Sequence, residues 1–148
     1  MLIGEFDVSI DEKSRFMIPA KIRAQIDGDI IIATKGLGKN LRLFTPEKWK
    51  IFSDTITKET RILNPADMEI CYDILAAAHT LDIDKMRRIV IPSKLKDLAG
   101  LKKDALILGL INFVELWDVE TYTLFRQENK EKGVAEESQK RLRELNFF

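Results

Sequence analysis

Short stretches of alternating apolar and polar residues occur in two similar parts of the chain. Residues 4–10 (GEFDVSI) and 80–83 (TLDI) alternate in this way, and each leads through a polar turn into a β-branched run, 15–19 (RFMIP) or 87–92 (RRIVIP). Alternation of this kind is typical of half-buried strands, and a polar turn between two strands indicates a hairpin. Each part is therefore predicted to begin with a β-hairpin.

Prolines and glycines indicate a short helix after each hairpin. Pro19 and Pro92 lie where a helix begins without needing the N–H that proline lacks, and Gly28 and Gly100 lie near the expected helix ends. Two strands then follow in each part, at 29–34 and 41–44 and again at 105–110 and 113–117.

Longer helices are expected after these strands. Thr45 before Pro46, and Asp118, are suitable N-caps for a helix that closes each part. Asn64 before Pro65 is a suitable cap for an additional helix between the two parts. Residues 119–146 are charged and helix-prone, with Gly133 as the expected break.

The two parts are copies of one repeat. At an offset of 73 residues, 11–23 (DEKSRFMIPAKIR) aligns with 84–96 (DKMRRIVIPSKLK), and five of the thirteen positions are identical. About one identity is expected for unrelated segments of ordinary composition. At the same offset, 41–52 and 114–125 keep the same apolar positions. The sequence therefore indicates a duplication.

The repeat predicts how the chain is organised. Residues 1–60 form the first half with its closing helix, 61–78 form the helix between the copies, and 79–148 form the second half with the C-terminal helix. Each half has only about four short strands, and a sheet that small is marginally stable alone. We therefore expect the halves to intertwine or pack as one core.

Length and composition are those of a globular protein. With 148 residues, 45% of them apolar, the chain is long enough to bury a core. No stretch approaches the roughly 18 uncharged apolar residues of a membrane span, and the N-terminal residues do not resemble a signal peptide. We expect a cytosolic protein without membrane contact.

The chain has no net charge, but its basic residues are concentrated in two windows. The 24 basic and 24 acidic residues sum to zero, so the total gives no indication of nucleic-acid binding. The two repeated windows, 11–23 and 84–96, nevertheless contain nine basic residues and three acidic ones. Any contact with a polyanion must depend on these windows.

The residues usual in catalytic and metal sites are few. His79 is the single histidine and Cys71 the single cysteine, and neither lies in a known catalytic motif. Glu69 and Asp73 share a predicted helix face, where a solvated acidic surface is a commoner explanation than a metal site with His79. The segment 35–40 (KGLGKN) lacks the spacing of a phosphate-binding loop and indicates a hairpin turn. The aromatic residues fall on apolar positions and indicate core packing. Because no catalytic motif and no cofactor-binding loop can be identified, neither an enzyme nor a cofactor is predicted.

The repeated polar turn is the strongest candidate for function. An aspartate and an arginine recur four residues apart, as Asp11 with Arg15 and Asp84 with Arg88. The simplest interpretation is a hairpin loop whose charges remain hydrated. Two such turns in a pseudo-symmetric fold also form a matched pair, in which arginine can bind phosphate or the O6/N7 edge of guanine while the aspartate orients it.

These turns, the opening residues 1–19, the middle segment 76–92 (AAAHTLDIDKMRRIVIP) and 112–122 (NFVELWDVETY) resemble the MraZ family of bacterial regulators. The halves resemble the AbrB-type swapped-hairpin domain. The resemblance implies an α+β fold of two AbrB-type swapped-hairpin β-barrel halves in one pseudo-symmetric core, with flanking helices.

The resemblance also implies a function and partners. The family binds double-stranded DNA as sequence-specific transcriptional regulators of the division and cell-wall gene cluster, reading repeated boxes upstream of their own operon. It forms ring-like homo-oligomers, commonly octamers. A cytoplasmic protein associated with the nucleoid is therefore expected. The alternative is a ring-forming structural or interaction module without specific DNA binding, in which the arginines bridge subunits.

The expected DNA-binding residues lie in the two turns. Arg15 and Arg88 are predicted to make the principal contacts, oriented by the aspartates Asp11 and Asp84, and the phosphate contacts are predicted for Lys13, Lys85 and Arg87. The family usually has glycine immediately before each arginine, whereas this chain has Ser14 and Arg87. If that position needs a positive φ, these two residues either strain the turn or change it.

Overall fold

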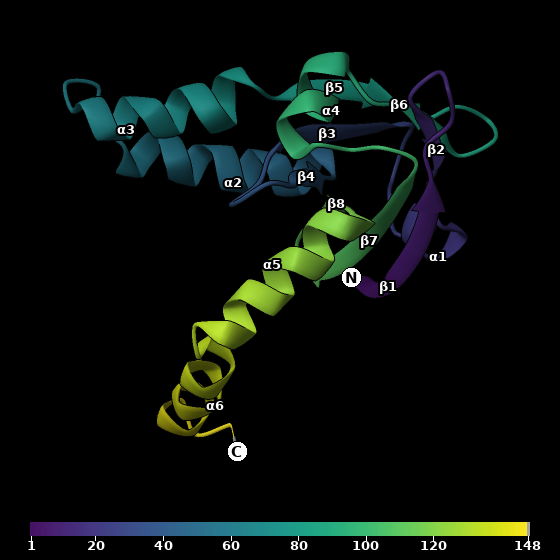
Figure 1. Ribbon diagram of the computed structural model, residues 1–148. Helices are drawn as coiled ribbons and strands as arrows, with labels where there is room; N and C mark the ends of the chain where they lie inside the picture. The colour runs from purple at the N-terminus through teal and green to yellow at the C-terminus, as the bar shows by residue number, and fades with distance from the viewer. Residues whose placement is uncertain (148) are drawn as a thin grey trace. The chain divides into compact units, whose positions relative to one another are not determined.

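The strands and helices of the chain occur twice in the same order (Figure 1), in a computed structural model that describes residues 1–147. The first copy consists of β1 (Leu2–Ser9), β2 (Arg15–Met17), α1 (Ala20–Arg23), β3 (Ile30–Lys35), β4 (Leu41–Phe44) and α2 (Pro46–Glu59). The second consists of β5 (His79–Asp82), β6 (Arg88–Val90), α4 (Ser93–Ala99), β7 (Asp104–Ile111), β8 (Val114–Asp118) and α5 (Val119–Glu131). Between the copies lie α3 (Pro65–Ile70) and the π-helical turn η1 (Cys71–Ala76), and α6 (Val134–Glu144) follows the second copy.

Two of the predicted helix starts are confirmed by their capping contacts. The side chain of Thr45 accepts a hydrogen bond from the Lys48 N–H at the start of α2, and that of Asn64 accepts from the Asp67 N–H at the start of α3. Gly133, with φ 75°, lies between α5 and α6. The segment 35–40 forms the turn between β3 and β4, closed by the hydrogen bond from Gly36 N–H to the Asn40 carbonyl.

The strands pair across the two copies. Six strands form one antiparallel sheet in the order β1-β7-β8-β4-β3-β5, and β2 and β6 form a separate two-stranded ribbon. Strand β1 of the first copy therefore pairs with β7 of the second, and β5 of the second pairs with β3 of the first. This exchange confirms the predicted α+β fold with intertwined, duplicated halves.

A pseudo-twofold axis relates the copies, and the strand register shows where it passes. In the centre of the sheet Arg42 of β4 is opposite Glu115 of β8, and in the ribbon Phe16 is opposite Ile89. Both pairs are separated by the repeat offset of 73 residues, so each residue faces its own counterpart. The axis therefore runs through the middle of both the sheet and the ribbon.

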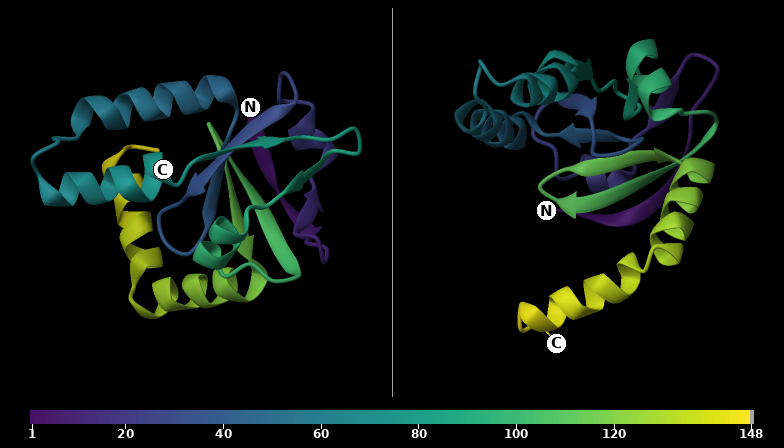
Figure 2. Two further views of the ribbon diagram at one scale, coloured as in Figure 1. Left: turned by 90° about the horizontal axis from the view of Figure 1, so that it is seen from above. Right: turned by 60° about the vertical axis from the view of Figure 1, so that its left-hand side comes forward.

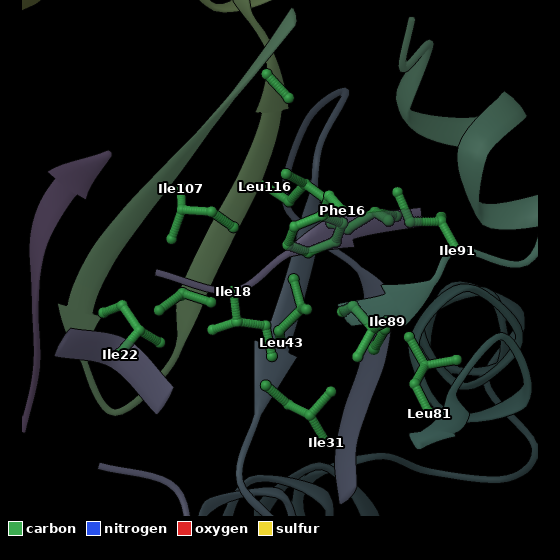
Figure 3. Packing of buried hydrophobic residues seen from close by; sticks show 14 of the residues in the cluster. Phe16, Ile18, Ile22, Ile31, Leu43, Leu81, Ile89, Ile91, Ile107 and Leu116 are labelled. Carbon is green, nitrogen blue, oxygen red and sulfur yellow. The ribbon is translucent and has the colours of Figure 1, made fainter. Parts of the chain in front are cut away.

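One hydrophobic core lies between the six-stranded sheet and the ribbon. Figure 3 shows side chains of both copies meeting there: Phe16, Ile18, Ile22, Ile31 and Leu43 from the first, and Leu81, Ile89, Ile91, Ile107 and Leu116 from the second. Leu116 is fully excluded from solvent at 0% exposure, and Phe16 is nearly so at 2%. Neither copy encloses this core alone, which explains why the strands are exchanged.

Helices α2 and α3 run antiparallel to each other (Figure 2). Helix α2 contacts β3 and β4, and η1, which continues α3, contacts β3. The Thr34 hydroxyl of β3 donates to the Ile74 carbonyl of η1 at 2.6 Å. Phe44 at the end of β4 packs against Trp49 and Phe52 of α2, with ring centroids 5.4 and 4.8 Å away. The prediction of core packing is confirmed for Phe44, which is buried, whereas Trp49 and Phe52 are half-buried and Phe125 is 37% exposed.

The chain divides into two compact units. The first, Met1–Asp118, contains both sheets and the core, and the second begins at Val119 and contains α5 and α6. This division follows the contacts within the fold, whereas the predicted segments 1–60, 61–78 and 79–148 follow the sequence repeat. Those segments therefore stay a prediction. Among the helices of residues 1–147, none has the length and apolarity needed to cross a membrane.

The shared core predicts a large cost for a cavity at its centre. We expect Leu116→Ala to lower the free energy of unfolding by about 2–5 kcal/mol, because this side chain is completely buried on a central strand. Urea denaturation followed by circular dichroism measures the change. The control Leu63→Ala, at a side chain 95% exposed between α2 and α3, should change it by less than about 0.5 kcal/mol. Equal effects of the two substitutions would contradict the assigned core.

Candidate nucleic-acid interface

The β2–β6 ribbon has one buried and one outward face. Phe16 and Ile89 point into the core, whereas Arg15, Met17, Arg88 and Val90 lie on the other face. Arg15 is opposite Val90 and Arg88 is opposite Met17, so the two arginines are diagonal neighbours on one face. Diagonal residues of an antiparallel pair are about 7–8 Å apart. In Figure 1 the turns before β2 and β6, purple and green, extend at the upper right.

The first turn, residues 11–15, is closed by the Asp11 carboxylate. Its Oδ1 accepts hydrogen bonds from the backbone N–H groups of Lys13 and Arg15, both at 2.9 Å. Its Oδ2 accepts from Arg15 Nε at 2.8 Å, which is also an ion pair. The backbone adds a bond from Asp11 N–H to the Arg15 carbonyl at 2.8 Å. One side chain therefore fixes both the loop and the arginine.

The second turn, residues 84–88, repeats this arrangement. Asp84 Oδ1 accepts from the N–H groups of Met86 and Arg88 at 2.8 Å, and Oδ2 accepts from Arg88 Nε at 2.8 Å. The strands on either side of each turn pair with the other copy and not with each other. The turn is thus a local unit, and the pairing around it is long-range.

The ion pair leaves the outer end of each arginine available. Aspartate binds Nε, and within residues 1–147 the terminal Nη1 and Nη2 of Arg15 and Arg88 have no hydrogen bond or ion pair. The two side chains are 29% and 32% exposed. A guanidinium held at Nε presents its two terminal nitrogens as a planar fork, the geometry that binds phosphate or the guanine edge bidentately.

The same contacts lower the pKa of both aspartates. The pKa of Asp11 is lowered first by the hydrogen bond from the Arg15 backbone N–H, and then by the Arg15 side chain and the Lys13 N–H, while partial desolvation acts in the opposite direction. The pKa of Asp84 is lowered in the same order by Arg88 and Met86. Both carboxylates therefore stay ionised at neutral pH and hold their arginines.

The residues in place of the family's usual glycine do have a positive φ, 59° at Ser14 and 61° at Arg87. This conformation lets the Ser14 carbonyl accept from Ile91 N–H and the Arg87 carbonyl accept from Ile18 N–H, at 2.8 and 2.7 Å. These bonds extend the ribbon beyond its three residue pairs at both ends. The turn is therefore kept, and two side chains are held in a backbone conformation that favours glycine.

The remaining predicted phosphate contacts differ in their surroundings. Lys13 and Lys85 are exposed at the outside of their turns. Arg87 instead turns toward the first copy, where its Nη2 lies 3.2 Å from Met17 Sδ and its Nε is buried without a hydrogen-bond partner. The structure thus brings Arg15, Arg88, Lys13 and Lys85 to the turns and leaves Arg87 only partly accessible.

One contact near the first turn was not predicted from the sequence. The Lys96 ammonium of α4 donates to the Ser14 hydroxyl at 3.1 Å, between residues 82 positions apart. The sequence shows Lys96 in the second basic window, 84–96. Its partner Ser14 belongs to the first copy, so this contact could not be predicted from neighbouring residues.

The alternative metal site lacks support in the side-chain contacts. Asp73 pairs with Lys35 at 3.2 Å, and His79 Nδ1 lies 2.8 Å from the Ala77 carbonyl. Among the described residues, no three histidine, cysteine, aspartate or glutamate side chains are grouped to hold a metal ion.

Together, the exchanged strands and the paired arginine turns define a duplicated swapped-hairpin protein with one outward basic ribbon. The family model described as "MraZ protein, putative antitoxin-like" matches residues 1–68 and 74–145. This chain belongs to the MraZ family of transcriptional regulators. That role is not enzymatic, which confirms the prediction of a non-enzyme.

Individual relatives are similar over nearly their whole length. A transcriptional regulator MraZ of Treponema denticola is 40% identical over 129 residues, which are 87% of this chain and 90% of the relative. The protein of the same name from Natranaerobius thermophilus is 34% identical over 139 residues, 93% and 96% of the two chains. The solution structure of PHS018 from Pyrococcus horikoshii covers 78% of this chain and 88% of its own at 16% identity, but its TM-score of 0.34 is too low to support a conclusion.

The left-handed residue of the second turn predicts a stabilising substitution. We expect Arg87→Gly to raise the free energy of unfolding by about 0.5–1 kcal/mol, because it relieves the positive φ and removes a buried Nε without a partner. Urea denaturation measures the change. Met86→Gly, in the same turn without a positive φ, should give no gain. A loss of stability in Arg87→Gly would show that its contact with Met17 outweighs the strain.

The lowered aspartate pKa values predict a pH dependence of stability. A carboxyl with a lowered folded-state pKa contributes stability that is complete above its ordinary pKa of about 3.9 and is lost as the pH falls through the lowered value. The difference in unfolding free energy between the wild type and Asp11→Asn/Asp84→Asn should therefore be constant above about pH 5 and shrink below about pH 4. Denaturation at a series of pH values tests this. A difference that stays the same from pH 6 to pH 3 would contradict it.

Proposed function

We propose that this protein is a sequence-specific DNA-binding transcriptional regulator that reads double-stranded DNA with the β2–β6 ribbon. The observation that carries the proposal is the pair of arginines on one outward face, each held at Nε by its aspartate with its terminal nitrogens unbound among the described residues. Asp11 and Asp84 act as orienting groups and do not touch the DNA themselves.

The shape of the ribbon suits the major groove. That groove is wide enough for an α-helix or a two-stranded β-ribbon, and each base pair presents a distinct pattern of donors and acceptors there. Arg15 and Arg88 each bind the O6 and N7 atoms of a guanine or a neighbouring phosphate. Met17 and Val90, each opposite one of the arginines on the same face and 44% and 55% exposed, give an apolar contact for a thymine methyl group.

Lysines next to the arginines supply phosphate contacts. Lys13 and Lys85 are exposed in the two turns, and Arg87 adds charge near the second. These residues act locally, since the net charge of the chain is zero. Binding of this kind releases counterions from the DNA and weakens steeply as the salt concentration rises.

The target and the assembly are part of the same proposal. The resemblance implies repeated boxes upstream of the protein's own operon in the division and cell-wall gene cluster. It also implies a ring-like homo-oligomer, an octamer in the commonest description, in the cytoplasm at the nucleoid. Several ribbons on one ring bind several boxes, so weak single contacts add through their linkage.

A direct test compares two duplexes. Fluorescence anisotropy is measured with the DNA upstream of this protein's own gene and with a shuffled duplex of equal composition, at several salt concentrations. Tight binding to the first alone, with a steep salt dependence, is the expected result. Equal and weak binding to both would reject sequence-specific recognition.

Substitution of either turn arginine is predicted to weaken DNA binding. Arg15→Ala or Arg88→Ala should weaken binding to the upstream duplex by about 1–3 kcal/mol per engaged subunit, while the thermal unfolding temperature stays close to that of the wild type. The control Arg61→Ala removes an arginine whose side chain is 80% exposed next to α3, and it should leave the affinity unchanged. Unchanged affinity in both turn variants would remove these residues from the interface.

The second candidate function is a ring-forming interaction module without specific DNA binding. The balance of 24 basic and 24 acidic residues favours it, because DNA-binding proteins usually carry net positive charge. In that case the arginines bridge subunits. Size-exclusion chromatography with light scattering would then show smaller assemblies for Arg15→Ala and Arg88→Ala, and no DNA affinity at any salt concentration.

A further inference from the structure

The two turns have the same backbone but different charge. The first contains two acids, Asp11 and Glu12, and two bases, Lys13 and Arg15, and is neutral in total. The second contains one acid, Asp84, and three bases, Lys85, Arg87 and Arg88, so its charge is +2. The first turn therefore needs a cation from elsewhere to attract a phosphate as strongly as the second does.

The structure places such a cation beside the first turn. Lys96 Nζ lies 3.1 Å from Ser14 Oγ, and Ser14 directly precedes Arg15. Lys96 is half-buried on α4, and within residues 1–147 it forms no ion pair with any carboxylate. An ammonium has three N–H donors, and the Ser14 contact uses one of them.

The pseudo-symmetric counterpart of Lys96 is engaged elsewhere. Arg23 of α1 lies at the same place in the first copy, and its Nη2 pairs with Asp29 at 2.9 Å while Nη1 donates to the Ile26 carbonyl at 2.9 Å. The counterpart of Asp29 in the second copy is Lys103, whose carbonyl accepts from Ile10 N–H as that of Asp29 accepts from Ile83 N–H, so the acid is replaced by a base. The counterpart of Ser14 is the cation Arg87, which repels Arg23 and cannot hold it as Ser14 holds Lys96.

We propose that Lys96 and Ser14 form a phosphate-binding site for the DNA backbone next to Arg15. This inference rests on the proposed function and adds a group from α4 to it. The ammonium supplies charge and two remaining donors. The Ser14 hydroxyl accepts from Lys96 and keeps its own O–H for a phosphate oxygen. The second turn uses the exposed Lys85 for the same purpose, and Arg23 takes no part because Asp29 neutralises it.

The site also gives a reason for serine at a position that favours glycine. A glycine would adopt φ 59° without strain but would have no hydroxyl to hold the ammonium. Ser14 thus connects the first turn to α4 of the other copy, and it fixes a cation next to the arginine proposed to bind DNA.

The test compares Lys96→Met with Lys94→Met, a matched loss of one exposed lysine from the same helix. Both variants and the wild type are titrated with the upstream and shuffled duplexes at several salt concentrations. In Lys96→Met the slope of log affinity against log salt should become shallower by about one per engaged subunit. Affinity for both duplexes should fall by the same factor, because a phosphate contact carries no sequence preference. Lys94→Met should behave as the wild type.

Ser14→Gly provides a second variant, which suits the turn backbone and removes the serine side chain with its hydroxyl. It should also weaken binding to both duplexes equally, by less than Lys96→Met does. A wild-type slope in Lys96→Met, or an equal change in Lys94→Met, would overturn the Lys96 site while leaving the proposed function intact. A wild-type protein that shows no preference for the upstream duplex would instead overturn the proposed function.

Discussion

The pairing of β2 with β6 across the pseudo-twofold axis is the constraint on which both the core and the candidate interface depend. Its inner face contributes Phe16 and Ile89 to a core that neither copy can enclose alone. Its outer face carries Arg15 and Arg88 at a fixed diagonal spacing. Because one ribbon of three residue pairs performs both tasks, burial of the core sets the distance between the two arginines, and the stability of the fold and the geometry of the site are coupled.

The two turns show how a local unit can be reused with different surroundings. Each aspartate binds two backbone N–H groups and the Nε of its arginine, so the turn geometry depends on residues within five positions of one another. The residue before the arginine adopts the same positive φ in both copies, yet Ser14 contacts Lys96 and Arg87 contacts Met17. Duplication therefore preserved the backbone, while the side chains acquired separate contacts with the opposite copy.

Features that depend on nearby residues were predicted well from the sequence. The caps Thr45 and Asn64 and the break at Gly133 each act within a few positions, and the structure confirms them. The two short strands of the ribbon were found for the same reason. The predicted hairpins were correct as turns, but their strands pair with the other copy. The orientation of Arg87 and the contact of Lys96 could not be predicted from neighbouring residues, because both depend on groups 70 and 82 positions away in the sequence.

The sequence alone determined the duplication, the order of the elements and the Asp-x-x-x-Arg turns, because periodicity, capping and turn formation depend on residues that are close in sequence. Only the tertiary structure decided which strands pair, where the twofold axis passes and which cations stand beside each turn. Those features follow from burying one shared core, a long-range requirement that both copies satisfy together. Identical local patterns are compatible with many pairings, and burial of Phe16 and its counterpart Ile89 in one core favours the pairing of β2 with β6.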